Sequence, residues 1–259
     1  MQGPVAKAGA YHPIMLVNVV TAVHAPYARF LASVWSSLDA QSHREWTWLV
    51  QIDGPDKAVR DALEACGAAT DPRVRVAVNG TSEGPAVTRN LALARADAPL
   101  IQNVDADDEL EPGTLSVLVT ALAEHPGAGF AVGHARDLLP DGQLRGHALP
   151  LSPGPIARGA LLDAWRGTLP VHPAGAMWRR SLLLALGGWS ALYGMEDTGL
   201  LMAASATSEG VLVDAPTLRY RKHADQTSAQ PSLFAGAGEQ VALIRQRAQI
   251  LLGQAVWTG

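Results

Sequence analysis

The chain has 259 residues, of which 48% are hydrophobic and 17% are charged, a balance that supports a buried core and excludes an intrinsically disordered chain. Its formal net charge of −4 gives no basic footprint, so a nucleic-acid partner or an acidic membrane surface is not expected. The single cysteine, Cys66, excludes an internal disulfide and a cysteine-based zinc site.

Targeting and membrane signals are weak. The N-terminal stretch MQGPVAKAGAYHP lacks the long apolar core of a signal peptide. No apolar run reaches the roughly 18 residues that a membrane-spanning helix needs. These observations predict a cytoplasmic enzyme or binding protein without an integral membrane segment, and they leave its oligomeric state open.

The first half of the chain predicts strands that alternate with helices. Short apolar, β-branched runs indicate buried strands, and apolar residues at helical spacing indicate helices. In chain order these are strand 14–20, helix 26–41, strand 47–53, helix 57–66, strand 73–78, helix 86–96, strand 100–104 and helix 112–124. This alternation implies right-handed crossovers and a mostly parallel sheet in one α/β domain.

Beyond residue 127 the pattern changes. A hairpin is predicted from 129–139 and 143–149, with Pro140-Asp141-Gly142 as its turn. Residues 150–174 contain five prolines and predict a loop-rich segment. In chain order there follow a short strand and a helix within 174–189, a helix at 196–204, an extended segment at 211–222 and an amphipathic helix at 233–252.

Acidic residues gather directly after the fourth predicted strand. The stretch LIQNVDADDELEP places four acids in five positions, beginning at Asp105. Thr21, Asp53 and Asp105 all fall at the carboxyl ends of predicted strands, where open α/β sheets bind their ligands. Asp105 and Asp107, one residue apart in a turn, suit a hard cation such as Mg²⁺ or Mn²⁺ that also binds water and phosphate oxygens.

Other interpretations of these acids are weighed by spacing. A calcium-binding EF-hand loop starting at Asp105 would need Gly and Glu where Leu110 and Ser116 stand. An aspartyl phosphatase would place its acids after the first strand, where Thr21 lies. The remaining alternative is that the later acids, above all Glu109, merely begin the next helix and interact with its dipole.

Six short motifs together resemble the inverting family 2 glycosyltransferases, which have the GT-A fold. Their order along the chain matches that family from about residue 14 to about 228. They are Thr21 near the first strand, Asp53-Gly54, G-P-A-V-T-R-N (84–90), N-V-D-A-D-D-E-L-E-P (103–112), L-G-G-W-S (186–190) with G-M-E-D (194–197), and R-Y-R-K-H (219–223).

The resemblance implies a GT-A domain over 14–228, with a central sheet flanked by helices. Its nucleotide-sugar half would span about 14–127 and its acceptor half about 128–228, and residues 229–259 would form a C-terminal helix packed on the domain. The implied activity is that of a hexosyltransferase (EC 2.4) that uses a nucleotide-diphosphate sugar donor, a small-molecule or glycan acceptor, and Mn²⁺ or Mg²⁺.

The resemblance also implies roles for individual residues. Asp107 would bind the metal directly, Asp105 would contact the ribose or the metal through water, and His223 would complete the metal shell. The donor would be contacted by further residues: Thr21, Asp53, Arg89, Trp189 and Arg221. Among these, Asp53 would accept from the imide of the base, Arg221 would meet the diphosphate, and Trp189 would either stack on the sugar or pack in the core.

The predicted general base is Asp197, which follows a Gly-rich turn at the start of a helix. Glu196 stands beside it, and repulsion between adjacent carboxylates tends to raise one pKa toward a catalytically useful range. The alternative for both acids is a helix-capping role.

Two competing functions remain open. A sugar nucleotidyltransferase would need a Gly-rich loop after the first strand, whereas TAVHAPYAR contains no glycine. A non-catalytic nucleotide-sugar or carbohydrate-binding module would not need the Glu-Asp pair together with His223.

Overall fold

The computed structural model describes residues 15–147, 151–229 and 237–254, and in its first half strands and helices alternate as predicted. The strands are β1 (Val17–Val23), β2 (Trp46–Ile52), β3 (Val74–Val78), β4 (Leu100–Asn103) and β5 (Glu109–Leu110). The helices are the 3₁₀ turns η1 (Ala25–Phe30) and η2 (Ala68–Thr70) and the α-helices α1 (Leu31–Asp39), α2 (Lys57–Ala65), α3 (Pro85–Ala94) and α4 (Thr114–Glu124).

The second half contributes two long strands and the remaining helices. The strands are β6 (Ala128–Leu138), β7 (Leu144–Gly146), β8 (Gly154–Ile156), β9 (Met177–Arg179) and β10 (Glu209–Arg221). The helices are α5 (Ala160–Ala164), α6 (Arg180–Leu186), α7 (Glu196–Thr207), η3 (Thr227–Ala229) and α8 (Ala237–Leu252). Parts of the predicted elements, at residues 14, 148–150 and 233–236, lie outside the described residues.

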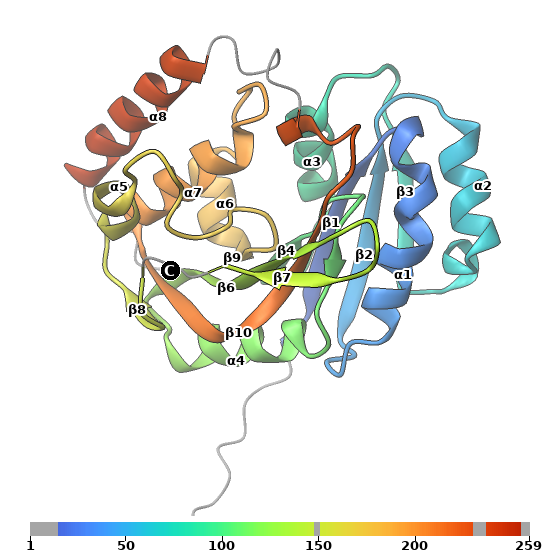
Figure 1. The fold of residues 1–259 in the computed structure, drawn as a ribbon, viewed down its shortest axis with the longest axis horizontal. Helices are drawn as coiled ribbons and strands as arrows, with labels where there is room; N and C mark the ends of the chain where they lie inside the picture. Colours follow the sequence, from blue (N-terminus) through green and yellow to red (C-terminus); the bar gives the residue numbers. More distant parts are fainter. Residues whose placement is uncertain (1–14, 148–150, 230–236, 255–259) are drawn as a thin grey trace, which may run out of the picture.

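All these strands join one sheet in the order β3-β2-β1-β4-β9-β6-β10-β5, with β7 paired to β6 and β8 paired to β10 (Figure 1). The strands β1 to β4 are parallel, because helices carry the chain back between them. Beyond β4 the sheet is mixed, since β9 runs antiparallel to both β4 and β6. The predicted α/β sheet flanked by helices is therefore confirmed, but it is mixed rather than mostly parallel: β1 to β4 form a wholly parallel block, and beyond it, among the described strands, only β6 and β10 pair in parallel.

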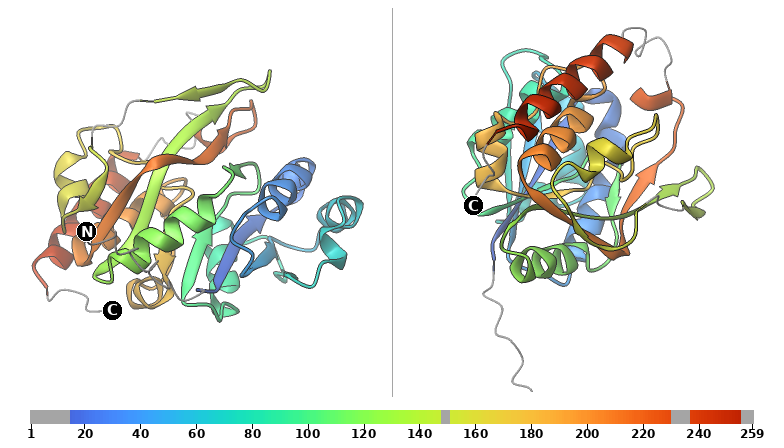
Figure 2. Two further views of the ribbon diagram at one scale, coloured as in Figure 1. Left: turned by 90° about the horizontal axis from the view of Figure 1, so that it is seen from below. Right: turned by 90° about the vertical axis from the view of Figure 1, so that its left-hand side faces the viewer.

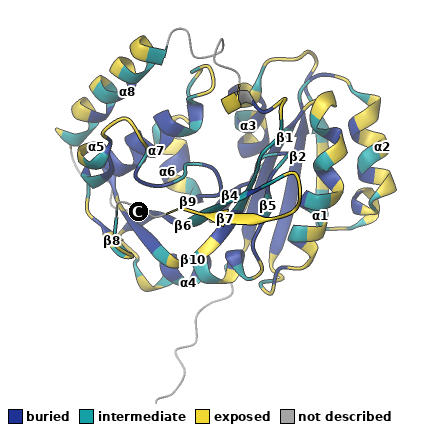
Figure 3. Ribbon diagram, viewed as in Figure 1, coloured by how far each residue is buried: buried dark blue, intermediate teal, exposed yellow. Residues whose placement is uncertain are grey.

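The core lies on both faces of the sheet. Leucine and valine side chains of α1, α2 and α4 pack on one face, and those of α3, α5, α6 and α7 pack on the other. The right-hand view of Figure 2 shows α4 below the sheet and α7 with α8 above it. Because α7 is enclosed between the sheet and α8, nearly all of its residues are buried, as Figure 3 shows in dark blue.

Three local differences from the sequence interpretation affect the site. The strand β1 continues to Val23, three residues beyond its predicted end. Glu109 lies in β5, which pairs with β10, and α4 begins at Thr114, so the alternative that Glu109 starts that helix is wrong. The predicted hairpin around Pro140 is confirmed by the antiparallel pairing of β6 with β7.

Candidate active site

A buried arginine joins acids from two distant segments. In Arg89, Nη2 lies 2.6 Å from Asp105 Oδ1 and 3.4 Å from Asp197 Oδ2, while Nη1 lies 3.3 Å from Glu196 Oε1. Arg89 is 6% exposed, so its charge needs these partners. Its guanidinium links the end of β4 to the start of α7, whereas the sequence interpretation placed it against the nucleotide.

The predicted base is held among charges of both signs. Burial raises the pKa of Asp197 to about 7, an effect that the charge of Arg89 opposes and those of Asp105 and Glu196 reinforce. The indole Nε1 of Trp189 donates to Asp197 Oδ1 at 2.7 Å. The side chain of Asp197 is 19% exposed, so it is not fully enclosed by the protein. A partly exposed carboxyl with a near-neutral pKa has the properties of a general base.

The predicted metal ligands meet although they are far apart in sequence. In the structure His223 Nε2 lies 2.9 Å from Asp107 Oδ2. Burial and the charge of Asp105 raise the pKa of Asp107, and the contact with His223 opposes this. The neighbouring Asp108 is fully buried, and burial raises its pKa well above the usual range. The imidazole of His223 thus contacts one carboxylate of this acidic loop, that of Asp107.

Arg221 holds this acidic loop in place. Its Nε donates to the carbonyl oxygen of Asp107 at 2.7 Å, and its Nη2 lies 2.5 Å from Glu109 Oε1. Its backbone N–H also donates to Asp108 Oδ1 at 2.9 Å. The side chain was predicted to meet the diphosphate, but in this structure its donors are directed at the loop itself.

Asp53 is surrounded by donors from its own chain. Its two oxygens accept from Glu83 N at 2.7 Å, Gly84 N, Ser82 Oγ and Thr88 Oγ1 at 3.0 Å, and Asn79 Nδ2 at 3.2 Å. Burial raises the pKa of Asp53, but these hydrogen bonds, led by that from the Glu83 amide, outweigh it and hold the pKa below its usual value. The carboxylate secures the start of α3, which leaves little capacity for a nucleobase imide.

Gly54 explains how that loop approaches so closely. It has a φ of 87°, and a Cβ at this position would lie 3.0 Å from the backbone nitrogen of Ser82. Only glycine satisfies both conditions without strain.

Two other predicted donor contacts are core residues. Thr21 is 0% exposed, and its Oγ1 accepts from Trp48 Nε1 at 2.9 Å. The error arises because β1 extends beyond Thr21, so this side chain points into the core rather than leaving the strand's end. Trp189 is 2% exposed, which agrees with the core-packing alternative and leaves no ring face open to a sugar.

The comparison with protein families decides the broader identity. The sequence model described as "Glycosyl transferase family 2" matches residues 19–186, which is more than half of the chain. The chain belongs to glycosyl transferase family 2. An uncharacterised protein of Sinorhizobium fredii is 32% identical over 114 residues, which cover 44% of this chain. The match spans 12% of the length of that relative.

Solved structures of S. aureus TarS share the fold of this family 2 chain. TarS residues 1–349 with UDP-GlcNAc superpose with a TM-score of 0.73 at 16% identity, covering 92% of this chain and 70% of that one. The same fragment with UDP gives 0.65 at 17% identity, with the same coverage of both chains. A longer TarS structure gives 0.69 at 16% identity, covering 88% of this chain and 39% of that one.

The donor atoms of Asp107 and His223 fit a divalent cation. A carboxylate oxygen suits Mg²⁺ or Mn²⁺, and an imidazole favours a transition metal, here Mn²⁺. Within the described ranges no group of three or more His, Cys, Asp or Glu side chains is placed to hold a metal ion. Two protein ligands would leave the other coordination positions of such an ion to water and phosphate oxygens. Asp105, also predicted as a ligand, is bound to Arg89 instead.

Sequence reasoning missed several polar residues at this family 2 site. His172, in the proline-rich segment, packs on Tyr220 with ring centroids 4.4 Å apart, and burial lowers its pKa to about 4. Asn90 exchanges two hydrogen bonds with the backbone of Trp189, both 2.9 Å. Asn90 could have been found, because it directly follows Arg89 in the quoted motif, whereas nothing in its proline-rich surroundings marks His172.

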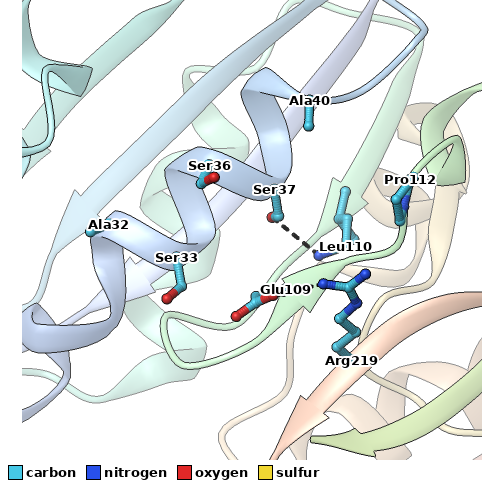
Figure 4. Close-up of a pocket in the computed structure, with 9 residues that line it drawn as sticks. All are labelled: Ala32, Ser33, Ser36, Ser37, Ala40, Glu109, Leu110, Pro112 and Arg219. Atoms are coloured by element: carbon cyan, nitrogen blue, oxygen red, sulfur yellow. Dashed lines mark hydrogen bonds and ion pairs between the residues drawn. The ribbon is translucent and has the colours of Figure 1, made fainter. Parts of the chain in front are cut away.

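A separate groove of about 390 Å³ lies between α1 and β5 (Figure 4). Small residues of α1 face Glu109 and Arg219 across it, and Ser37 Oγ accepts from the Leu110 N–H at 3.2 Å. Asp105, Asp107 and Asp197 do not line this groove. It therefore lies outside the acidic site. No helix in the described ranges is long and apolar enough to cross a membrane.

Proposed function

We propose that the protein transfers a hexosyl group from a nucleoside-diphosphate sugar to an acceptor hydroxyl, with inversion at the anomeric carbon. The observation that carries this is the convergence of three predicted groups, in which Arg89 ties the base Asp197 to Asp105 at the end of β4. Family 2 membership supports the reaction class. The nucleotides bound by TarS, UDP-GlcNAc and UDP, make a UDP-sugar the first donor to test.

Asp197 acts as the general base in this proposal. The acceptor oxygen forms a bond to the anomeric carbon, the bond from that carbon to the diphosphate oxygen breaks, and the acceptor proton passes to an oxygen of Asp197. With a pKa of about 7, the carboxylate is both present at neutral pH and basic enough to assist. Arg89 and Trp189 keep it oriented. Glu196 balances the buried charge of Arg89.

Asp107 and His223 would hold a divalent cation, Mn²⁺ or Mg²⁺. Such an ion neutralises the negative charge that develops on the departing diphosphate. Arg221 keeps the carbonyl of Asp107 in place and so fixes the direction of this ligand.

The test measures turnover, stereochemistry and products. UDP-hexoses are incubated with Mn²⁺, and NMR follows the anomeric configuration of the released or transferred sugar. The proposal expects UDP release with inversion of the anomeric configuration. The rate of UDP release by Asp197→Asn should be at least 100-fold lower, since general base catalysis contributes about 10²–10⁴-fold. Asp163→Asn, which changes an exposed acid on α5, is the matched control.

The same measurement, repeated with a nucleoside triphosphate and a sugar phosphate in place of the UDP-hexose, separates the two alternatives. A sugar nucleotidyltransferase would release pyrophosphate from a nucleoside triphosphate and a sugar phosphate. A binding module would bind UDP-sugars without releasing UDP. Either outcome would overturn the proposal. The cytoplasmic location expected from the sequence remains a prediction.

A further inference from the structure

Tyr193 is an exposed aromatic residue in the loop that leads to the predicted base. Of the Phe, Tyr and Trp side chains that the structure describes, that of Tyr193 alone is exposed, with 64% of the residue accessible. It lies in the segment that joins α6 to α7, four residues before Asp197. Single exposed aromatic residues are common on protein surfaces, so exposure by itself assigns no role.

The backbone around Tyr193 is fixed from two sides. Side-chain amides hold both ends of segment 189–193: Asn90 of α3 bonds to both backbone groups of Trp189, and Gln240 of α8 does the same at Tyr193. The Tyr193 N–H donates to Gln240 Oε1 at 2.7 Å, and Gln240 Nε2 donates to the Tyr193 carbonyl at 3.2 Å. In Figure 1 this segment lies between α3 and α8.

A second contact from α8 reaches the same segment. Arg247 Nη1 donates to Ser190 Oγ at 2.6 Å, and its Nη2 donates to the carbonyl of Leu186 at 2.8 Å. The exposed ring is therefore carried by an ordered backbone rather than by a loose loop tip. Ordering that is already present in the free protein does not oppose the binding of a ligand.

We infer that Tyr193 forms an acceptor subsite that stacks on a carbohydrate ring, and that Gln240 is its positioning residue. This inference rests on the proposed transferase function, because an acceptor must bring its hydroxyl to the exposed part of Asp197. An aromatic face packs well against the C–H face of a pyranose, while the phenolic oxygen stays in water. The substrate class is thus an acceptor that contains a sugar ring, not a ringless alcohol.

The probes are methyl α- and β-hexopyranosides, with sorbitol as the ringless comparison. Their binding is measured by saturation-transfer NMR in the presence of UDP and Mg²⁺, which is diamagnetic. The variants are Tyr193→Ala, Tyr193→Phe and Gln240→Ala. The matched control on α8 is Gln249→Ala, because this residue is an exposed glutamine on the opposite side of the helix from Gln240.

The wild type should bind a pyranoside more tightly than sorbitol. In Tyr193→Ala the Kd should rise about tenfold, as expected for the loss of one aromatic stacking contact. Tyr193→Phe should keep the affinity, Gln240→Ala should lose part of it, and Gln249→Ala should match the wild type. Donor hydrolysis by Tyr193→Ala should stay within about twofold of wild type, so that acceptor KM changes while turnover of the donor by water does not.

Equal pyranoside affinity in Tyr193→Ala and wild type would overturn the subsite, as would a wild type that binds none of the pyranosides. These results are separate from a failure of the proposed function. That failure would appear as absent donor turnover in the wild type, and the NMR measurement does not depend on turnover.

Discussion

Replacing Asp197 by asparagine tests its burial as well as its chemistry. Burial raises the pKa of this carboxyl from 3.8 to about 7. A carboxyl whose pKa is higher in the folded chain favours folding at low pH, and this contribution is lost as the pH rises from the unfolded-state to the folded-state pKa. The gap corresponds to about 4 kcal/mol, as an order of magnitude.

Asparagine carries no charge at any pH and can still accept from the indole of Trp189. Asp197→Asn should therefore be more stable than the wild type above about pH 7, by up to a few kcal/mol, and close to it near pH 4. Urea unfolding of both proteins at pH 4, 6 and 8 measures the difference, with Asp163→Asn as control. A difference that does not grow between pH 4 and pH 8 would refute the buried, raised-pKa carboxyl.

The wild-type rate should report the same group. A base with a pKa of about 7 is about one-tenth deprotonated at pH 6, so transfer should fall roughly tenfold per pH unit below 7. Asp197→Asn should lose most of the transfer rate, and the remaining rate should no longer decrease as the pH falls below 7. Its donor affinity should stay near that of the wild type. If its remaining activity keeps the wild-type pH profile, another group is the base, and Glu196 is the first to examine.

Three further predictions follow from the same contacts. Arg89→Met leaves the acids around it without their cation, so the free energy of unfolding measured in urea should fall by about 3–5 kcal/mol. If the variant remains active, the decrease of its transfer rate at low pH should begin at a higher pH than in the wild type. Asp107→Ala should abolish Mn²⁺-dependent UDP binding in calorimetry while the protein stays folded; unchanged affinity with Mn²⁺ would contradict the metal assignment. The loop-rich segment, described here over 151–174, should gain hydrogen-exchange protection when the donor binds, and equal protection would count against a lid.

The first half of the fold follows closely from its sequence. Strand 47–53 corresponds to β2, all of whose residues are buried, and helix 57–66 corresponds to α2. Their apolar patterns are long enough to show one period clearly. The short strands β5 and β8 could not be foreseen in the same way, because two or three residues carry no period and their pairing with β10 is set by the tertiary structure.

The site, like the fold, could be predicted from the sequence only in part. Residue type and motif order predicted that Asp107 and His223 lie together, and the structure places their side chains in contact although they are 116 positions apart in sequence. They did not reveal that Asp53 is surrounded by amides and hydroxyls, because the donors that approach a carboxylate depend on how loops fold against it. Thr21 fails for a more local reason: a strand end misplaced by three residues turns a surface position into a buried one.

The positions of the two arginines in the site make the proposed divalent metal ion more important for binding a diphosphate. Both were predicted on the nucleotide side, yet Arg89 is paired with buried acids and Arg221 with the acidic loop. The Nζ of Lys222, which directly follows β10, lies 3.4 Å from Asp137 Oδ1. Each of these three cations already has a carboxylate partner, so an incoming diphosphate would meet negative charge beside them, and like charges disfavour binding. A divalent ion at Asp107, as proposed, would reverse the sign of the charge that the diphosphate meets. For this reason Asp107→Ala, which removes a negative charge, should bind UDP at least as well as the wild type without metal, and should fail to gain affinity when Mn²⁺ is added.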